Sequence, residues 1–546
     1  MICIRCAATA VAMLRATIAS LLAGPLLAAA ALHPVQQDAR KFLRRYFNTT
    51  DEISQQRRHA GEFAASHDED PLRAMYSALR FFTTLFESRD SIDLPAAEAH
   101  HVLDAACSVA DLLLAVRPTA AARESVRTLW AEQQQMRCWP VFVKQYKADP
   151  SSCLDLTSVV KYDQRVEVAK NRCRANCEYR AHPEVEFFHN GELLHALAAL
   201  AHVLARQGRS ADAARYITAA SQCVQDRLFS THSPLDSQGR VVTAAAADGE
   251  WSWRAFLLTC DPCVNSPQAY NHAGQLAVAV HRLVAAIEAN GDASLPWARL
   301  VVSDPGGPIA PRSTFVECLR AVAAAFVAHW QDSARTRVLE DGTKVLAWKY
   351  RDFNPSSCAH HDTLKDRWED INHAAIDVEQ LSLLFDGGRN PYGLTVEYMQ
   401  ALMNTFLRSY VVDRSATDSA RFACDLSGTT TDKKSCGQPT RTGDGRVFAA
   451  AKWLILPNTL MGVTSSVPAA PSVSVSIGPL CAAMVADILP AVEPLLVRLL
   501  RRPAESNQSG LETPNLPGGA RYEFMRYLYP SPIVEIARLP DECIPS

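Results

Sequence analysis

The segment Glu369–Asp377 combines carboxylates and an imidazole at a spacing that suits acid–base chemistry. Successive residues of an α-helix advance by about 100°, so Glu369, His373 and Asp377, each four apart, would form one stripe. Carboxylates on both sides of an imidazole raise its basicity and fix its tautomer, as a general base or a metal ligand requires. The same charges also suit the solvent-exposed first turn of a helix, so spacing alone leaves both interpretations open.

Aromatic and basic residues precede this segment in the chain. Trp348, Tyr350 and Arg351 would offer a sugar acid a ring face for stacking and a cation for its carboxylate. A tryptophan packed under a disulfide-bonded loop is the structural alternative. His360 and His361 are metal-ligand types, but adjacent histidines rarely both bind one ion, so we expect no metal and no cofactor.

A second cluster opens a predicted helix over residues 268–289, with Pro267 near its first turn. Asn271 and Gln275 lie four apart and offer neutral hydrogen-bonding groups, while the Tyr270 hydroxyl could act as an acid or a base. The alternative is that these residues are ordinary cap and surface groups.

Further polar and aromatic residues also come just before apolar helices. His189 and Asn190 precede a predicted helix over residues 191–207, although a loop with a buried Phe pair explains them equally well. Trp253 lies among charged residues upstream of residue 268. In a closed ring of helices the starts of the inner helices open on one rim, so we expect these clusters to meet in one cleft.

Apolar residues recur with helical period in many separate blocks. The predicted helices cover residues 97–116, 191–207, 268–289, 313–330, 366–386, 395–410 and 477–502. A turn at Gly208–Ser210 joins the second of these to another helix, which gives an αα-hairpin. Such hairpins occur in open solenoids and in closed (α/α) toroids. A solenoid should repeat at a fixed interval, and no second copy follows here, so we predict an all-α fold of the toroid type.

Long polar loops separate the helices, at residues 137–186, 230–267, 336–365 and 413–446. Loops of this length are uncommon unless they are functional or cross-linked. Two of the 16 cysteines, Cys3 and Cys6, lie in the apparent leader, and the even number that remains favours disulfides in an oxidising compartment. The close pairs Cys173–Cys177 and Cys260–Cys263 leave zinc as the alternative. We therefore predict a toroid with long, disulfide-stapled loops.

Residues 1–31 are typical of a signal peptide, because Arg5 and Arg15 are combined with an apolar stretch that ends in small residues. A membrane anchor is the alternative, but the apolar run is short and is broken by Gly24 and Pro25. No later segment looks long and apolar enough to span, so we expect a periplasmic or secreted protein without stable membrane insertion.

The predicted toroid domain covers residues 32–502, and residues 503–546 form a C-terminal loop and a terminal segment that packs on the toroid. The formal net charge of −3 argues against a nucleic-acid partner, which would require a basic surface.

The order of Pro267–Gln275, Trp348–Tyr350 and Glu369–Asp377 resembles helical-toroid proteins of the alginate-lyase-like and glucuronyl-epimerase-like type, over about residues 265–410. The resemblance implies that Asn271 neutralises a uronate carboxylate and that Tyr270 or His373 removes the C5 proton and protonates the leaving oxygen. The cysteine-rich loops depart from these lyases, and no tyrosine lies obviously opposite His373.

We therefore expect an exported polysaccharide lyase or epimerase that acts on a uronate-containing polysaccharide or oligosaccharide. The expected catalytic residues are His373, Tyr270 and Glu369. The expected substrate contacts are Asn271, Gln275, Trp348, Tyr350, Arg351, Trp253, Asn190, His189 and Asp377. Two alternatives stay open: a glycoside hydrolase using carboxylates such as Glu250 and Asp370, and a non-catalytic helical module that binds glycan or protein.

Overall fold

The structure is a computed structural model of the chain. It describes residues 33–46, 49–66, 69–117, 137–139, 187–229, 260–261, 266–267, 269–291, 301–302, 313–349, 368–385, 391–426, 443–466, 471–501, 530–540 and 543–544. The predicted signal peptide, Trp253, Tyr350 and Arg351 lie outside the described residues, as do Glu250, His360 and His361.

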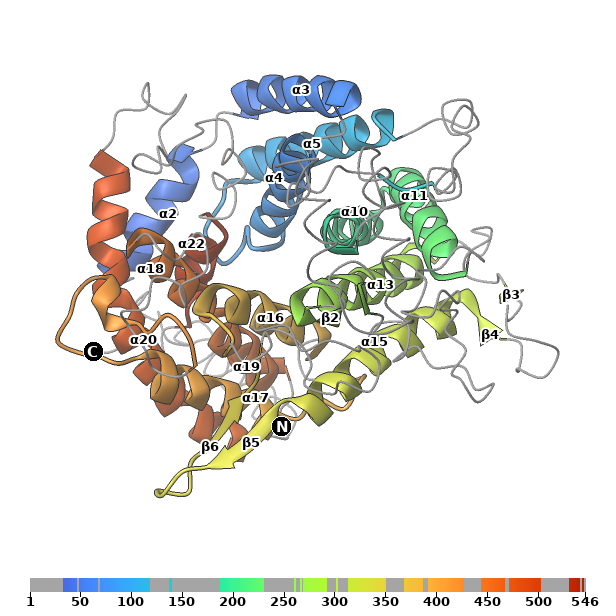
Figure 1. Cartoon of the computed structure of the whole chain (residues 1–546). Helices are drawn as coiled ribbons and strands as arrows, with labels where there is room; N and C mark the ends of the chain where they lie inside the picture. Colours follow the sequence, from blue (N-terminus) through green and yellow to red (C-terminus); the bar gives the residue numbers. More distant parts are fainter. Residues whose placement is uncertain are drawn as a thin grey trace, which may run out of the picture.

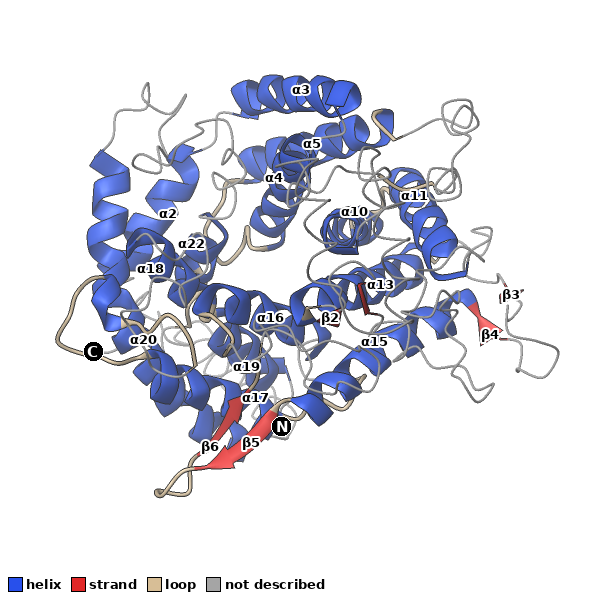
Figure 2. Cartoon of the chain, in the orientation of Figure 1, coloured by secondary structure: helices blue, strands red, loops and turns tan. Residues whose placement is uncertain are grey.

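Helices make up most of the described chain, which confirms the predicted all-α class (Figures 1 and 2). They are α2 (Pro34–Tyr46), α3 (Thr49–Ser66), α4 (Glu69–Glu87), α5 (Ala96–Ala115), α10 (Phe187–Arg206), α11 (Ser210–Phe229), α13 (Tyr270–Asn290), α15 (Phe315–Ser333), α16 (Ile371–Phe385), α17 (Val396–Thr405), α18 (Gly443–Lys452), α19 (Ile455–Ser466), α20 (Pro471–Arg501) and α22 (Pro530–Ala537). A π-helical turn, η4 (Phe406–Tyr410), continues α17, and a 3-10 turn, η5 (Ser419–Arg421), follows. All seven helices predicted from periodicity are present.

In the described part of the chain, three short antiparallel strand pairs accompany the helices. They are β1 (Cys260–Asp261) with β2 (Ser266–Pro267), β3 (Val301–Val302) with β4 (Ser313–Thr314), and β5 (Arg335–Val338) with β6 (Lys344–Ala347). In the longest pair Arg335 lies opposite Ala347 and Val338 opposite Lys344, and Gly342 takes a positive φ of 81° in the turn. Strands of two to four residues are too short to produce a visible alternation in the sequence.

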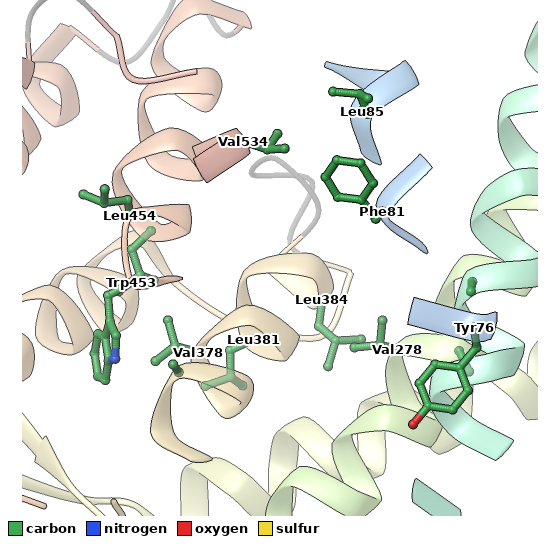
Figure 3. Packing of buried hydrophobic residues seen from close by; sticks show 14 of the residues in the cluster. Tyr76, Phe81, Leu85, Val278, Val378, Leu381, Leu384, Trp453, Leu454 and Val534 are labelled. Atoms are coloured by element: carbon green, nitrogen blue, oxygen red, sulfur yellow. The ribbon is translucent and has the colours of Figure 1, made fainter. Parts of the chain in front are cut away.

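The helices form a closed series of neighbours. In this series α4 packs on α10, α10 on α13, α13 on α16, α16 on α18, α18 on α22, and α22 on α4 (Figure 1). Helix α5 packs on α4, α11 on α10, α15 on α13, and α20 on α18. Figure 3 shows buried side chains that fill the space between members of the series: Phe81 from α4, Val278 from α13, Leu384 from α16 and Val534 from α22.

Helices of the closed series are more completely buried than the helices packed on them. On α10 every residue from His189 to Ala201 is buried, and α13 is buried nearly all round, as expected for helices enclosed by others. On α5 the buried residues follow one face. Glycines allow the close approach of the enclosed helices, because a Cβ at Gly191 would lie 2.9 Å from the Cβ of Gln275. A Cβ at Gly274 would overlap the Gln380 side chain on α16.

Disulfides connect distant parts of the chain, as predicted. Cys138 is bonded to Cys223 on α11, and Cys481 on α20 is bonded to Cys543. Cys424 is also disulfide-bonded, whereas Cys107 on α5 has no disulfide partner, so the pairing of cysteines is not complete. The C-terminal helix α22 packs against α2, α4 and α18 and is part of the helical body.

Helix α20 corrects one expectation. Its segment Ile477–Val497 has a mean hydropathy of 1.9 and is long and apolar enough to cross a membrane by length and composition. The expectation that no segment after the leader meets this criterion is wrong. In the structure 56% of the most apolar window is buried against the protein, and Asp487 within it pairs with Arg414 and Arg421. A core helix that packs on several neighbours needs the same apolar residues as a spanning helix.

Candidate functional site

The start of α16 is held in place by backbone hydrogen bonds on its extended leading segment, Trp368–Asp370. The amide of Ile371 donates to the Cys424 carbonyl at 2.9 Å, and the amide of Leu426 donates to the Glu369 carbonyl at 3.1 Å. The Asp370 side chain caps the helix, because its Oδ1 accepts from the amides of Asn372 and His373. Several polar side chains are therefore fixed within one helical turn.

His373 and Asp370 form a hydrogen-bonded pair in which the imidazole Nδ1 donates to the Asp370 Oδ2. Burial lowers the pKa of His373, but the Asp370 carboxylate outweighs this effect, and the pKa is raised from its ordinary value. Burial correspondingly raises the pKa of Asp370, and His373 outweighs it, so that this pKa is lowered. The His373 side chain keeps 26% of its surface exposed and can meet a ligand.

Behind this pair lie two buried carboxyl groups, Glu369 and Asp377, each only 1% exposed. Burial raises the pKa of both groups, and their mutual proximity raises the pKa of Glu369 further. Trp348 Nε1 donates to the Asp377 Oδ2 at 3.1 Å. The two carboxyls therefore retain a proton under conditions in which an exposed carboxyl is ionised. Glu369, His373 and Asp377 lie close together, but Glu369 precedes α16 instead of belonging to a helical stripe, and only His373 has substantial exposure.

A π-helical turn supports the same region from the other side. The Tyr410 hydroxyl, at the end of η4, donates to the Glu369 carbonyl at 3.0 Å. π-Helical turns inside helices occur frequently at functional sites.

Glu369, Asp370 and His373 could also hold a metal ion, because their ligand atoms lie within 4.8 Å of one another. An ion bound there would have to replace the hydrogen bond between Asp370 and His373 and remove the proton favoured by the raised pKa of Glu369.

Two of the aromatic residues predicted for the site lie inside the protein. Trp348 is 1% exposed, and its ring lies 5.4 Å from that of Trp330. Tyr270, 3% exposed, lies 5.1 Å from the same Trp330 ring and stacks on His329. Trp348 and Tyr270, predicted as a stacking residue and an acid or base, therefore belong to a buried aromatic cluster.

Trp368, to which the sequence analysis gave no role, is 37% exposed. The Lys349 ammonium lies 5.9 Å from the centroid of its ring. Trp368 and Asp370 are two apart in an extended segment, so they lie on the same side, and Glu369 lies on the buried side. The exposed ring next to the Asp370–His373 pair is therefore that of Trp368.

Side chains from the early turns of α4, α10 and α13 lie close together. The rings of Phe188 on α10 and His272 on α13 lie 5.1 Å apart, and the Arg73 guanidinium on α4 lies 5.5 Å from the Phe188 ring centroid. Arg73 is also close enough to His373 to lower the pKa of the imidazole in part. This arginine was missed because α4 carries no local signal that directs one of its residues to α16.

The remaining predicted binding residues lie inside the protein. His189 shares a 3.0 Å hydrogen bond with the Tyr76 hydroxyl. The Asn190 amide accepts from the Trp139 N–H and donates to the Trp139 carbonyl, both at 3.0 Å. Asn271 is 4% exposed and Gln275 is 1% exposed, and the Asn271 carbonyl accepts from Gln380 Nε2 at 2.8 Å.

Comparison with known proteins does not identify the class of protein. No family model, no curated protein and no solved structure matches this chain.

Proposed function

We propose that this chain is an exported (α/α) toroid that acts as a lyase or epimerase on a polysaccharide containing uronic acids. The observation that carries the proposal is the partly exposed Asp370–His373 pair at the start of α16, with the Arg73 cation nearby. The disulfides Cys138–Cys223 and Cys481–Cys543 favour an oxidising compartment outside the cytosol.

The closed series of helix neighbours supports the toroid. The inner ring in this proposal consists of α4, α10, α13, α16, α18 and α22, which contact one another in that order and close on α4. Along the chain each of α4, α10 and α13 is followed by a helix that packs on it, namely α5, α11 and α15. This alternation of an enclosed helix and a covering helix is the organisation of an (α/α) toroid built from αα-hairpins.

The proposed reaction begins with removal of the proton on the sugar carbon next to the carboxylate, C5. Asp370 holds Nδ1 of His373, so Nε2 takes the proton, and the Asp370 carboxylate stabilises the imidazolium that forms. Arg73 neutralises the uronate carboxylate, which makes the C5 proton more acidic. In a lyase the C–H electrons form the C4=C5 double bond as the C4–O bond breaks, and the imidazolium returns its proton to the leaving oxygen. In an epimerase a proton returns to C5 on the opposite face.

Burial decides which predicted residues can touch a sugar in this scheme. His373 takes the role of base, since Tyr270 and Glu369 are almost fully enclosed. Glu369 then acts as a positioning residue, with its Oε1 3.9 Å from the Nδ1 of His373. Trp368 provides the ring on which a sugar stacks, and Lys349 provides a cation beside it.

A glycoside hydrolase is less well supported by the same geometry. A hydrolase needs a protonated carboxylic acid that touches the glycosidic oxygen. The pKa of Asp370 is lowered, and this residue is bonded to His373, while Glu369 and Asp377 have raised pKa values but are buried.

The test is incubation of the mature protein with a panel of uronate polymers while the absorbance of unsaturated ends and the C5 configuration are followed. We expect activity on at least one polymer, loss of it in His373→Ala, and no change in His100→Ala, which alters an exposed histidine on α5. Reducing ends without unsaturation or inversion would instead indicate the hydrolase, and no change across the panel would contradict the proposal.

A further inference from the structure

The hairpin of β5 (Arg335–Val338) and β6 (Lys344–Ala347) projects from the helical body, with its turn pointing away from the helices (Figure 2). The two strands differ in their surroundings. Every residue of β5 is exposed, whereas on β6 only Lys344 is exposed and the other three residues are buried. One strand therefore anchors the hairpin, and the other is presented to solvent.

Helix α17 holds the hairpin from the β6 side. The Leu346 amide donates to the Thr405 hydroxyl at 2.7 Å, and the Asn404 side chain donates to the Lys344 carbonyl at 3.2 Å. These bonds occupy the outer edge of β6, so a further strand has no place there. They also fix the hairpin to the helix, which lowers the entropy lost when a ligand binds to the opposite edge.

The backbone of β5 offers hydrogen-bonding groups on the edge away from β6. The Leu339 amide donates to the Thr343 carbonyl at 2.9 Å, which makes these two residues a hydrogen-bonded pair. Pairs of this kind alternate along an antiparallel ladder, so Arg337 also bonds to β6, while the N–H and C=O groups of Thr336 and Val338 point outward. In the described part of the chain, no group outside the hairpin bonds to these outward groups.

The side chains of β5 carry charge on one face and an apolar group on the other. Arg335 and Arg337 alternate to one face, and Thr336 and Val338 to the opposite face. With 65% of its surface exposed, Val338 is the most exposed large hydrophobic residue of the described chain. An open strand edge beside an exposed apolar side chain is suited to strand addition, in which an extended peptide joins the sheet.

A second copy of the same chain is a poor occupant of this edge. Two β5 strands in antiparallel order bond through their outward residues, so the symmetry axis passes through Arg337 or through Thr336. The first register pairs Arg337 with the same residue of the second copy, and the second register places Arg335 opposite Arg337. Like charges directly opposite each other destabilise a strand pair, whereas opposite charges stabilise it. The charge of β5 therefore favours an acidic strand.

We propose that the outer edge of β5 binds an extended acidic segment of a partner protein as a third strand of the hairpin. The segment exchanges backbone hydrogen bonds with Thr336 and Val338. Its carboxylates, at alternate positions, lie opposite Arg335 and Arg337, and an apolar side chain between them packs on Val338. Docking at this edge is independent of the reaction proposed at His373.

The test uses the full-length protein and a labelled peptide that alternates glutamate and valine. A peptide with glutamine in place of glutamate is the neutral probe. Fluorescence anisotropy at low salt measures the affinity for both peptides, and hydrogen exchange measures protection of the Thr336 and Val338 amides. We expect the acidic peptide to bind about fivefold more tightly than the neutral one, because it gains exposed ion pairs, and to slow exchange at both amides.

A matched pair of variants at Thr336 separates strand addition from charge attraction. Thr336→Pro removes the outward N–H, and proline is tolerated on an edge strand where the N–H faces solvent. Thr336→Val keeps the N–H in an extended backbone. We expect Thr336→Pro to bind the acidic peptide about tenfold more weakly and Thr336→Val to bind it like the wild type. Arg337→Glu, which keeps the backbone, should reverse the preference toward a lysine-containing peptide and serves as the test if Thr336→Pro lowers the melting temperature.

Several results would overturn the proposal. They are failure of the wild type to bind the acidic peptide, equal affinity for the two peptides, and undiminished binding by a stable Thr336→Pro. Self-association in sedimentation that Thr336→Pro abolishes would assign the edge to a second copy instead. Binding of an acidic glycan that depends on Arg337 but not on the Thr336 N–H would assign the arginines to a sugar, and this too would exclude the acidic strand.

Discussion

Trp348 and Asp377 are joined by a buried hydrogen bond, in which the indole Nε1 donates to the carboxyl Oδ2 at 3.1 Å. The bond fixes the Trp348 ring behind α16, on the side away from solvent. It also gives the buried carboxyl pair, Glu369 and Asp377, a neutral donor that can remain in place whether or not the pair is protonated.

The buried pair should make stability depend on pH in a defined direction. Because burial raises the pKa of Asp377, the folded protein holds a proton that the unfolded chain releases above its ordinary carboxyl pKa of about 4. Stability is thus lost as the pH rises from there through the raised folded pKa. Asp377→Asn keeps an acceptor for Trp348 and does not titrate. We expect its melting temperature to exceed that of the wild type at neutral pH and the difference to vanish near pH 4.

Thermal denaturation at several pH values measures this effect. Glu98→Gln, which changes an exposed carboxyl on α5, provides the control and should give a small difference. A difference between Asp377→Asn and wild type that does not change with pH would show that the proton is not held by this pair.

The two tryptophans beside α16 should respond in opposite ways to substitution. Trp348→Ala opens a cavity in the core and removes the donor to Asp377, so we expect a loss of about 3–5 kcal/mol in the free energy of unfolding. Trp368→Ala removes an exposed ring, so stability should change by less than about 0.5 kcal/mol while affinity for an acidic glycan falls. Denaturant unfolding and glycan binding together measure both effects. Equal glycan affinity in Trp368→Ala and wild type would remove this ring from the site.

These tryptophans also show where prediction from sequence reaches its limit. The apolar periodicity of α5, α13 and α15 reports local burial on a helix face, so those helices could be located to within a few residues. In the sequence, Trp348 and Trp368 both stand next to charged residues, so either of them could belong to a sugar-binding site. Which of them is buried depends on the bridge between Lys349 and Trp368 and on the packing of Trp330, and these contacts are not local.

The ion pairs of Arg80 could not be predicted from the sequence for the same reason. Arg80 pairs with Glu192, which is 112 positions away in the chain, and with Glu379, which is 299 positions away. The charge of Arg73 likewise acts on His373 only because α4 lies in the same closed series as α16. The Glu369–Asp377 segment could be identified from its spacing, but its inward orientation could not, since a charged stripe at a helix start is usually solvated.

Asn190 should contribute mainly to stability. Its amide makes two hydrogen bonds to the backbone of Trp139, next to the Cys138–Cys223 disulfide. We expect Asn190→Ala to lower the free energy of unfolding by about 1–3 kcal/mol, because the buried Trp139 N–H and carbonyl lose these partners. Substrate affinity of the folded variant, measured below its melting temperature, should match the wild type. A folded variant of normal stability that fails to bind glycan would assign Asn190 to the site.

Asp487 should be essential to the packing of the apolar helix α20. Its carboxylate pairs with Arg414 and with Arg421, and the side chains of Asp487 and Arg421 are only 6% and 7% exposed. Asp487→Ala leaves the Arg421 cation buried without a carboxylate, so we expect a loss of about 3 kcal/mol in the free energy of unfolding. Glu288→Ala breaks an exposed pair with Arg320 and should cost less than about 1 kcal/mol. Equal effects of the two substitutions in denaturant unfolding would contradict this account.

Proton removal from a uronic acid by His373 is most directly tested by hydrogen exchange at C5. An acidic glycan that the protein turns over is incubated in deuterated water with wild type, His373→Ala or Asp370→Asn, and C5 is followed by nuclear magnetic resonance. The account predicts that wild type removes or exchanges the C5 proton, that His373→Ala does neither, and that Asp370→Asn is slowed because its imidazole is no longer oriented and stabilised by a carboxylate. Cleavage that leaves the C5 proton in place, or undiminished exchange by His373→Ala, would contradict it.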